Sequence, residues 1–412
     1  MRSDNVQGDD PITVDEAARI AKTRLPRHVW DFYACGSDDE KAVQRNFEAF
    51  DRLFILPRVM RNVANVDTST TIFGHRYPLP IGIAPSAMQR LVGGNGEVDM
   101  ARAASVLGMN MTLSSQSTTG LEEVIRERNG VDSPPPFWMQ IYLTQDLAKS
   151  TPLIKRAEGE HHSRKAFELS TKQSAAGYEA LVVTVDTPVL GNRINERKTP
   201  LVLPDNLRLA NIESSANAPK LRKPTFNRLL MDARTAQQAQ DIISSAGGSM
   251  HSASLEWAST IDFLRKTTDM KIILKGIMIP EDAALAVEHG ADAIVVSNHG
   301  GRQLDCAPST IEVLPDVAKA VDGKIPVIVD GGITRGSDVL KAVALGADFV
   351  LVGRAVLWGL AVDGQRGVEA IGNILERELS RSMALAGIKN LKEADRKMLA
   401  VARTGSFGMA RL

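Results

Sequence analysis

The chain has 412 residues, of which 43% are hydrophobic and 24% charged, and its two cysteines, Cys35 and Cys306, are too few for a disulfide framework. Its 49 basic residues balance 49 acidic ones, and a net charge of zero gives no reason to expect nucleic acid or an anionic membrane as a partner. Because no apolar run approaches the roughly 20 residues that cross a bilayer, and the first residues lack a signal-peptide core, we expect a soluble intracellular protein.

The first part of the chain has a helical character. Thr13, followed by Asp15 and Glu16, is typical of a helix start, and a second helical stretch over 28–34 ends before Gly36. We therefore predict that residues 1–65 form an N-terminal helical segment that packs on the main domain.

From residue 80 onward, short apolar stretches alternate with helix-like segments such as 96–106, 281–289 and 337–345. Nearly all-apolar strands that alternate with helices are typical of a parallel sheet covered on both faces. The eight stretches lie at 81–84, 110–114, 137–142, 180–185, 271–275, 293–296, 326–329 and 349–352. Eight strands close a (β/α)₈ TIM barrel, which we predict over 66–390. An open doubly wound sheet is the competing fold, but no Gly-x-Gly-x-x-Gly follows the first strand.

One long polar segment interrupts this alternation after the fourth predicted strand. It contains many Pro and Asn residues, and loops of this length in compact domains are usually lids or disordered segments. We predict a lid or insertion at 188–255 over the barrel mouth and a C-terminal tail at 391–412. The charged stretch 159–172, with His161 and His162, is expected to be a solvated surface element, and no metal site is predicted.

Polar and glycine residues gather where the predicted strands end. In a barrel these carboxyl ends form the active site, so residues that a packed core would not favour are candidates for function. The candidates in chain order are Pro85, Ser86, Ala87, Ser114, Gln140, Tyr142, Thr184, Asp186, Lys275, Ser297, His299, Asp330, Gly331, Gly332, Gly353 and Arg354.

The most informative segment is Ser-Asn-His-Gly-Gly-Arg-Gln-Leu-Asp at 297–305, which follows the apolar stretch 293–296. Its two glycines let the backbone turn and approach a ligand closely. His299 can exchange protons near neutral pH, and Arg302 can bind a carboxylate through two parallel hydrogen bonds. The spacing predicts an enzyme that moves a proton beside a carboxylate-bearing substrate.

Three further strand ends indicate a bound phosphate and a bound ring or anion. Phosphate in such barrels often lies between the loops after strands seven and eight, where Asp330-Gly331-Gly332 and Gly353-Arg354 stand. The alternative is two ordinary turns with a surface arginine. Lys275 projects from a buried strand, where its ammonium could stabilise developing negative charge; the alternative is a lysine that keeps the barrel mouth soluble.

These motifs, together with Thr184-Val185-Asp186-Thr187-Pro188 and Lys275-Gly276, resemble the FMN-dependent α-hydroxy acid oxidising family, which includes glycolate and lactate oxidases. The resemblance runs from about residue 13 to residue 390. It implies an FMN enzyme in which His299 is the base, Asp186 stabilises the cationic histidine, and Arg302 and Arg193 bind the substrate carboxylate.

The same resemblance implies roles for the other strand-end residues. Tyr142 matches a tyrosine near the substrate hydroxyl, and Lys275 matches the lysine beside flavin N1 and O2. Residues matching those that line the isoalloxazine ring are Pro85, Ser86, Ala87, Ser114, Gln140 and Thr184, and Ser297 is placed with the cofactor as well. The ribityl and phosphate site is matched by Asp330, Gly331, Gly332, Gly353 and Arg354.

Three positions depart from the family pattern. Phe32 stands where the family commonly has a tyrosine that touches the substrate carboxylate, and it cannot donate that hydrogen bond. Gln116 replaces a tryptophan that some oxidases place over the pocket, and Thr334 replaces an arginine that helps to hold phosphate. Substrate identity and the phosphate contacts are therefore the features in which this chain is most expected to differ from the family.

The expected reaction is oxidation of an L-2-hydroxy acid to the 2-keto acid, because removing two electrons requires a redox cofactor that side chains cannot replace. The electrons would pass to O₂ and give H₂O₂. A dehydrogenase using a quinone, a cytochrome or another acceptor is the alternative, and a catalytically silent flavin-binding scaffold is a third hypothesis. No nucleic acid or membrane partner is expected.

The family likeness implies a homo-oligomer, often a tetramer. The residues Ala410-Arg411-Leu412 have the form of a peroxisomal import tripeptide, with the cytoplasm as the alternative location.

Overall fold

The computed structural model describes residues 11–159, 177–212, 229–245 and 252–412. The part of the predicted surface insertion at 160–172, with His161 and His162, lies outside the described residues, as do 213–228 and 246–251 of the predicted lid.

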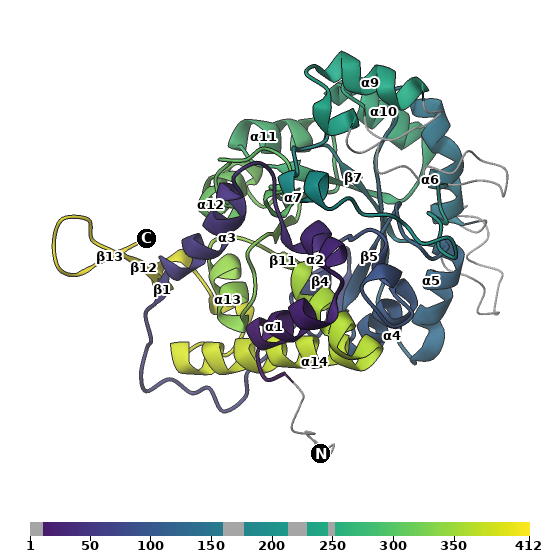
Figure 1. The fold of residues 1–412 in the computed structure, drawn as a ribbon. Helices are drawn as coiled ribbons and strands as arrows, with labels where there is room; N and C mark the ends of the chain where they lie inside the picture. Colours follow the sequence, from purple (N-terminus) through teal and green to yellow (C-terminus); the bar gives the residue numbers. More distant parts are fainter. Residues whose placement is uncertain (1–10, 160–176, 213–228, 246–251) are drawn as a thin grey trace, which may run out of the picture.

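Eight parallel strands close into a barrel at the centre of the molecule (Figure 1). The predicted (β/α)₈ barrel is therefore confirmed, and an open doubly wound sheet is excluded because β11 pairs with β4 and closes the ring. The strands are β4 (Ile81–Ile83), β5 (Asn110–Ser114), β6 (Trp138–Ile141), β7 (Ala180–Thr184), β8 (Lys271–Ile277), β9 (Ala293–Val296), β10 (Val327–Asp330) and β11 (Phe349–Val352).

Both faces of the barrel sheet are buried, which explains why the strands lack a polar alternation. Along β7, Val182 points into the barrel interior with Trp138 and Phe349, whereas its neighbours Leu181 and Val183 join the outer core. The interior is therefore a packed core, and a ligand can enter only at the ends of the strands.

One helix covers each strand on the outside. Described in chain order, these helices are α4 (Glu97–Leu107), α5 (Leu121–Glu127), α6 (Thr151–Glu158), α10 (Trp257–Thr267), α11 (Pro280–Glu288), α12 (Thr310–Val321), α13 (Gly336–Ala344) and α14 (Arg354–Ala386). None of the helices in the described part of the chain is both long and apolar enough to span a bilayer. Short 3₁₀ turns lie at Gln89–Leu91, Arg128–Gly130, Leu147–Ser150, His299–Gly301, Leu391–Glu393 and Arg396–Met398.

Three N-terminal helices pack against the barrel: α1 (Val14–Arg24), α2 (Arg27–Ala34) and α3 (Lys41–Asp51). As the sequence predicts, Thr13 caps α1, and its hydroxyl accepts a hydrogen bond from the Glu16 backbone N–H at 3.1 Å. Helix α1 lies along α14, while α2 and α3 run on toward the strand carboxyl ends (Figure 1). The N-terminal helices therefore contribute to the mouth of the barrel.

The segment after β7 carries two helices, α7 (Ile194–Lys198) and α9 (Ala236–Ser245). Helix α7 packs against α2, so this segment joins the N-terminal helices at the mouth. At the opposite end, the hairpin of β2 (Thr70–Ile72) and β3 (His75–Tyr77) closes the base of the barrel with buried Ile72 and Tyr77.

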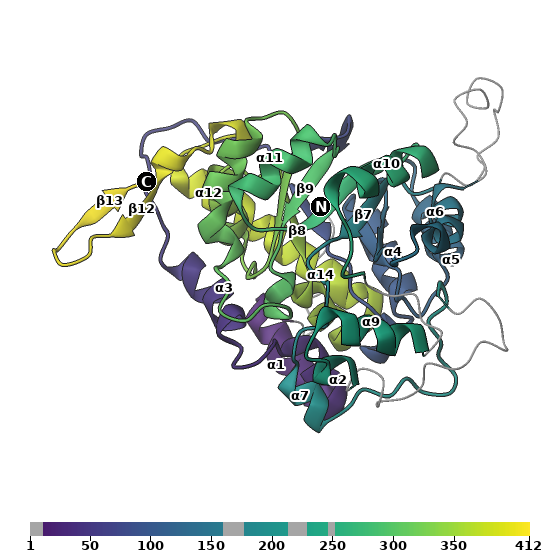
Figure 2. The same ribbon diagram turned by 90° about the horizontal axis from the view of Figure 1, so that it is seen from above.

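The C-terminal residues form a small antiparallel sheet. Strand β12 (Leu399–Ala402) pairs with β1 (Phe54–Ile55) on one side and with β13 (Met409–Arg411) on the other. The β12–β13 hairpin projects away from the body of the molecule in both views (Figures 1 and 2).

Candidate active site

A cavity of about 400 Å³ lies where the carboxyl ends of the strands meet. The structure brings most of the sequence-predicted residues to its wall: Pro85, Ser86, Ala87, Ser114, Gln140, Tyr142, Thr184, Arg193, Lys275, His299, Arg302, Asp330, Gly331, Gly332, Gly353 and Arg354. Asp186 and Ser297 stand just behind this wall, in contact with His299 and Lys275.

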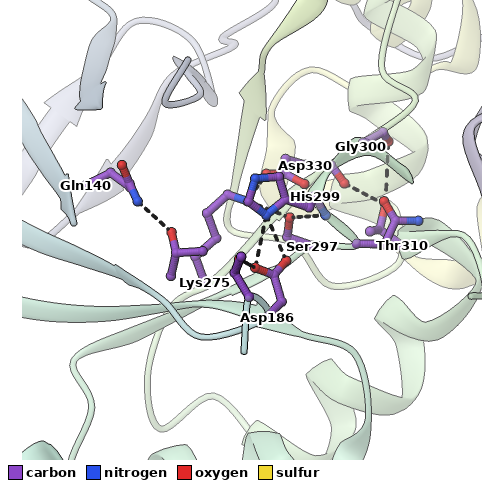
Figure 3. A network of polar contacts seen from close by, with 12 residues as sticks. Gln140, Asp186, Lys275, Ser297, His299, Gly300, Thr310 and Asp330 are labelled. Atoms are coloured by element: carbon purple, nitrogen blue, oxygen red, sulfur yellow. Dashed lines mark hydrogen bonds and ion pairs between the residues drawn. The ribbon is translucent and has the colours of Figure 1, made fainter. Parts of the chain in front are cut away.

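The His299 ring is held by the carboxylate of Asp186 (Figure 3). Nδ1 of His299 lies 3.0 Å from Oδ1 and 3.2 Å from Oδ2 of Asp186. An ionised carboxylate can only accept a hydrogen bond at this contact, so the hydrogen-bond network assigns the neutral ring a proton on Nδ1 and a lone pair on Nε2. That arrangement leaves Nε2 as the basic atom.

The electrostatics of the pair agree with a neutral histidine beside an ionised aspartate. Burial lowers the pKa of His299 below its usual range, and Lys275 and Arg193 act in the same direction, although Asp186 opposes them. Burial works against ionisation of Asp186, but the His299 ring and the Lys275 ammonium outweigh it and lower the pKa of Asp186 to about 2. Near neutral pH the ring can therefore accept a proton, and the carboxylate is ready to stabilise the resulting cation.

The backbone at His299 is strained in a way that aims the ring. His299 has φ 57° and Gly300 has φ 64°, so the chain turns through left-handed conformations that a non-glycine residue rarely adopts. The Ser297 hydroxyl accepts a hydrogen bond from the His299 N–H at 3.1 Å. Asn298 exchanges amide hydrogen bonds with Asn46 of α3, which fixes the loop to the N-terminal segment.

Lys275 occupies the centre of the polar network and is only 4% exposed. Its Nζ donates to the Ser297 hydroxyl at 2.8 Å and lies 3.3 Å from Oδ2 of Asp330 (Figure 3). Burial lowers the pKa of Lys275, but the carboxylates of Asp330 and Asp186 more than compensate and raise it, so the ammonium stays charged. A fixed positive charge therefore faces the cavity from β8.

Two arginines cap the C-terminal end of helix α2. Arg302 donates through one nitrogen to the carbonyls of Phe32 and Cys35, the latter at 3.1 Å. Arg354 donates to the carbonyls of Tyr33 at 2.9 Å, Gly300 at 2.9 Å and Cys35 at 3.3 Å. The last carbonyls of a helix lack intrahelical partners and carry partial negative charge, so cations are stabilised there.

A third guanidinium reaches the same cavity from the segment after β7. Nη1 of Arg193 lies 3.4 Å from Oε2 of Glu196, and its buried Nε has no hydrogen-bond partner among the described residues. Burial and the proximity of Arg193 and Arg354 lower the pKa of Arg302. Three guanidinium groups that crowd together, with an unused buried donor among them, create a site for an anion such as a carboxylate.

Tyr142 lies within electrostatic range of the whole cluster. Burial raises its pKa, with Asp186 adding to that effect and Lys275, Arg193 and Arg302 opposing it, so the phenol keeps its proton. Nearby, Gln140 donates to the Thr184 hydroxyl at 2.9 Å and accepts a hydrogen bond from the Ser114 hydroxyl at 3.3 Å. These side chains form one hydrogen-bonded wall across β5, β6 and β7.

The end of the cavity at β10 and β11 fits a phosphorylated cofactor. Gly331 and Gly332 have φ values of 95° and 79°, and an added Cβ on Gly332 would lie 2.1 Å from the Asn46 carbonyl oxygen. Only glycine adopts this backbone conformation without a side-chain clash, which leaves the backbone accessible to a ligand. Helix α14 begins directly after Gly353. Within the part of the chain that the structure describes, the buried Oδ1 of Asp330 has no hydrogen-bond partner, so it can accept a hydrogen bond from a hydroxyl group.

Several cavity residues carry no sequence signal that would have identified them. Trp30 and Phe47 come from the N-terminal helices, Leu190 and Leu230 from the segment after β7, and Trp358 from α14. None stands at the end of a strand, so only the packing of distant segments brings them to the cavity. Among the described residues, no cluster of histidine, cysteine or carboxylate side chains is arranged to hold a metal ion.

Comparisons with known proteins agree with this geometry. A family model described as FMN-dependent dehydrogenase matches residues 21–401. The chain is 41% identical over 391 residues to a 2-hydroxyacid oxidase of Dictyostelium discoideum, covering 95% of this chain and 90% of that protein. It is 39% identical over 402 residues to glycolate oxidase of Spinacia oleracea, covering 97% and 99%.

A solved structure shows the same architecture. A mandelate oxidase with (S)-4-hydroxymandelic acid is similar to this chain with a TM-score of 0.78 and 36% sequence identity, covering 96% of this chain and all of the other.

Proposed function

The chain belongs to the FMN-dependent dehydrogenase family, and on that premise we propose that its cavity oxidises an L-2-hydroxy acid to the 2-keto acid, with FMN as cofactor and O₂ as electron acceptor. The observation that carries this proposal is the convergence of His299, Arg193 and Arg302 on one cavity, with Asp186 behind the histidine. The reaction removes two electrons and two protons from the substrate, and transfer of both to O₂ gives H₂O₂.

The two arginines bind the substrate carboxylate. The Nε of Arg193, which has no hydrogen-bond partner in the described ranges, and the guanidinium of Arg302 offer charged donors in the same cavity. Holding the carboxylate fixes the position of the adjacent carbon and its hydroxyl, so that binding also orients these groups for the reaction. Tyr142, which stays protonated, donates a hydrogen bond near the substrate hydroxyl.

His299 removes a proton from the substrate through Nε2. The ring is neutral near neutral pH, and the proton on Nδ1 is already directed at Asp186. As the ring becomes cationic, the buried carboxylate 3.0 Å away stabilises the new charge. His299 is therefore the proposed catalytic base, and Asp186 orients it and stabilises its charged form.

FMN supplies the two-electron acceptor that no side chain can replace. We propose that its ring is lined by Pro85, Ser86, Ala87, Ser114, Gln140 and Thr184, with Lys275 and Ser297 beside it, and that Asp330, Gly331, Gly332, Gly353 and Arg354 hold its ribityl and phosphate groups. The positive charge of Lys275 favours negative charge that develops on a neighbouring ring.

The test uses the purified protein with its flavin. Under anaerobic conditions it is mixed with glycolate, L-lactate, (S)-mandelate and a long-chain 2-hydroxy acid, and the flavin absorbance is followed. We expect bleaching by at least one of these acids, and after admission of O₂, one H₂O₂ formed for each keto acid. A flavin that no 2-hydroxy acid bleaches contradicts the proposal. Reoxidation by a dye but not by O₂ contradicts the choice of acceptor.

We propose further that the protein assembles as a homo-oligomer, a tetramer by family likeness. Phe407 at the tip of the projecting hairpin is fully exposed, and so is Met60. The Arg58 N–H donates to the Ala386 carbonyl, which brings the exposed loop near Leu385, also exposed. Large apolar side chains that are exposed to solvent favour a protein contact. Light scattering after size-exclusion chromatography measures the mass, and Phe407→Asp should lower it.

For location, we propose import into peroxisomes, with the cytoplasm as the alternative. The support is the tripeptide Ala410-Arg411-Leu412 and an activity that produces peroxide. Fluorescence microscopy of an N-terminally tagged chain, compared with the same chain carrying Leu412→Asp, distinguishes the two locations.

A further inference from the structure

The ring of Phe32 faces the Arg302 guanidinium. The central carbon of that guanidinium lies 5.0 Å from the ring centroid, which is the geometry of a cation–π contact. The Phe32 carbonyl accepts a hydrogen bond from the same group, so one residue holds Arg302 from two directions. Phe32 is only 8% exposed, and both side chains line the cavity.

The Phe32 ring is itself held in a fixed orientation. It packs edge-to-face against Tyr33, with centroids 4.8 Å apart and planes at 89°. The Tyr33 hydroxyl lies 2.8 Å from each of the carbonyl oxygens of Ala87 and Met88 in the loop after β4. The chain of contacts thus runs from the β4 loop through Tyr33 and Phe32 to Arg302.

Arg302 needs such a support because of its neighbours. Arg193 and Arg354 lie close enough to disfavour its charge, and the side chain is buried. Like charges at this distance repel each other, and a flexible guanidinium would otherwise move away from them. The aromatic face and the helix C-terminal carbonyls compensate for that repulsion. The carbonyls occupy one terminal nitrogen, Nη1, and the rest of the guanidinium can serve the substrate carboxylate.

We propose that Phe32 is a positioning residue for the substrate carboxylate, acting through Arg302: its ring and carbonyl fix the guanidinium in the orientation that receives the carboxylate. This inference rests on the proposed function, because it takes Arg302 as a carboxylate ligand. Phe32 carries no polar side-chain atom and cannot itself donate a hydrogen bond to the carboxylate, so the proposed effect is exerted through the arginine.

The experiment replaces the ring while keeping the carbonyl. Phe32→Leu, with Phe32→Met as a second ring-free variant, should raise KM for the best 2-hydroxy acid by about three- to tenfold and leave kcat within about twofold. Oxalate carries carboxylates but no carbon-bound hydrogen, so it can bind without being oxidised. Its affinity should fall by the same factor in a calorimetric titration of the flavin-loaded enzyme. Phe263→Leu, on α10 away from the cavity, is the matched control and should change neither quantity.

A double-mutant comparison separates positioning from a general structural role. In the background of Arg302→Met, Phe32→Leu should lower kcat/KM by less than about twofold, because the cation that the ring orients is gone. If Phe32→Leu instead costs as much in this background as in the wild type, or if both ring-free variants leave KM and oxalate affinity unchanged, the proposal is overturned. If Arg302→Met alone leaves kcat/KM and oxalate affinity unchanged, it is instead the proposed role of Arg302 that fails.

Discussion

Nδ1 of His299, at the end of β9, lies 3.0 Å from Oδ1 of Asp186, at the end of β7, although 113 residues separate them in the chain. The contact fixes the ring tautomer, leaves Nε2 available as a base and places a buried negative charge where the cationic ring will need it.

Replacing the base should abolish turnover without displacing the cofactor. His299→Gln retains polar atoms and approximate size but has no basic ring nitrogen, so we expect kcat to fall by about 100- to 10,000-fold. Flavin absorbance of the purified variant should remain at the wild-type stoichiometry. Loss of flavin along with activity would point to a structural role for the loop, and unchanged turnover would remove His299 from the mechanism.

The rate should depend on pH in a defined direction. Because the pKa of His299 is lowered below 6.5, the ring stays neutral near pH 7, and kcat/KM should fall only as the pH drops below about 6.5 and passes through the lowered value. In Asp186→Asn the carboxylate that raises this pKa is absent. The acidic limb of the pH profile should then move to still lower pH, while kcat decreases because the cationic ring is no longer stabilised. An acidic limb that moves upward contradicts this account.

The same pair makes stability depend on pH. The pKa of Asp186 is about 2 in the folded state and 3.8 when unperturbed, so its contribution to the free energy of unfolding is present above about pH 4 and is lost as the pH falls toward 2. Urea denaturation between pH 5 and pH 2 should show a smaller loss of stability for Asp186→Asn than for the wild type. An equal loss in both proteins would show that other groups dominate acid unfolding.

Replacing Arg193, one of the two arginines proposed to bind the substrate carboxylate, should weaken substrate binding. Arg193→Met deletes a buried charged donor, and a charge-assisted hydrogen bond contributes about 1.5–3 kcal/mol, so kcat/KM should fall by about 10- to 100-fold. Arg197→Met on the same helix is the matched control, because Arg197 pairs with Asp232 and does not line the cavity. Equal losses in the two variants would indicate damage to α7 instead of loss of a substrate contact.

The glycines at the β10 end provide a test of the phosphate site. Gly332→Ala adds both a left-handed strain and a contact with the Asn46 carbonyl, so we expect a loss of about 3 kcal/mol in stability together with weaker FMN binding. Gly323→Ala has a similar φ of 69° but open space around it, and should cost only about 1 kcal/mol with unchanged FMN affinity. Flavin fluorescence titration of the apoprotein measures the difference, and equal FMN affinity in both variants would contradict the assignment.

Much of the fold follows from local patterns in the sequence. The eight nearly all-apolar stretches become the eight barrel strands because a strand buried on both faces has no polar alternation. The Thr13 cap works through contacts within four residues. The motif around His299 likewise includes the two glycines, Gly300 and Gly301, whose positive φ angles form its turn. Residues at strand ends could be named as site candidates because barrel closure brings all such ends together.

What the sequence alone determined, then, is the barrel and which side chains stand at its carboxyl edge, since both depend on short-range periodicity and turn residues. Only the tertiary structure decided that helix α2 delivers its terminal carbonyls to Arg302 and Arg354, and that Phe32 lies over Arg302. It also decided that Leu190 and Leu230 reach the cavity wall. These contacts join segments up to 321 residues apart, and they arise from packing the N-terminal helices and the segment after β7 onto one mouth, for which no local pattern codes.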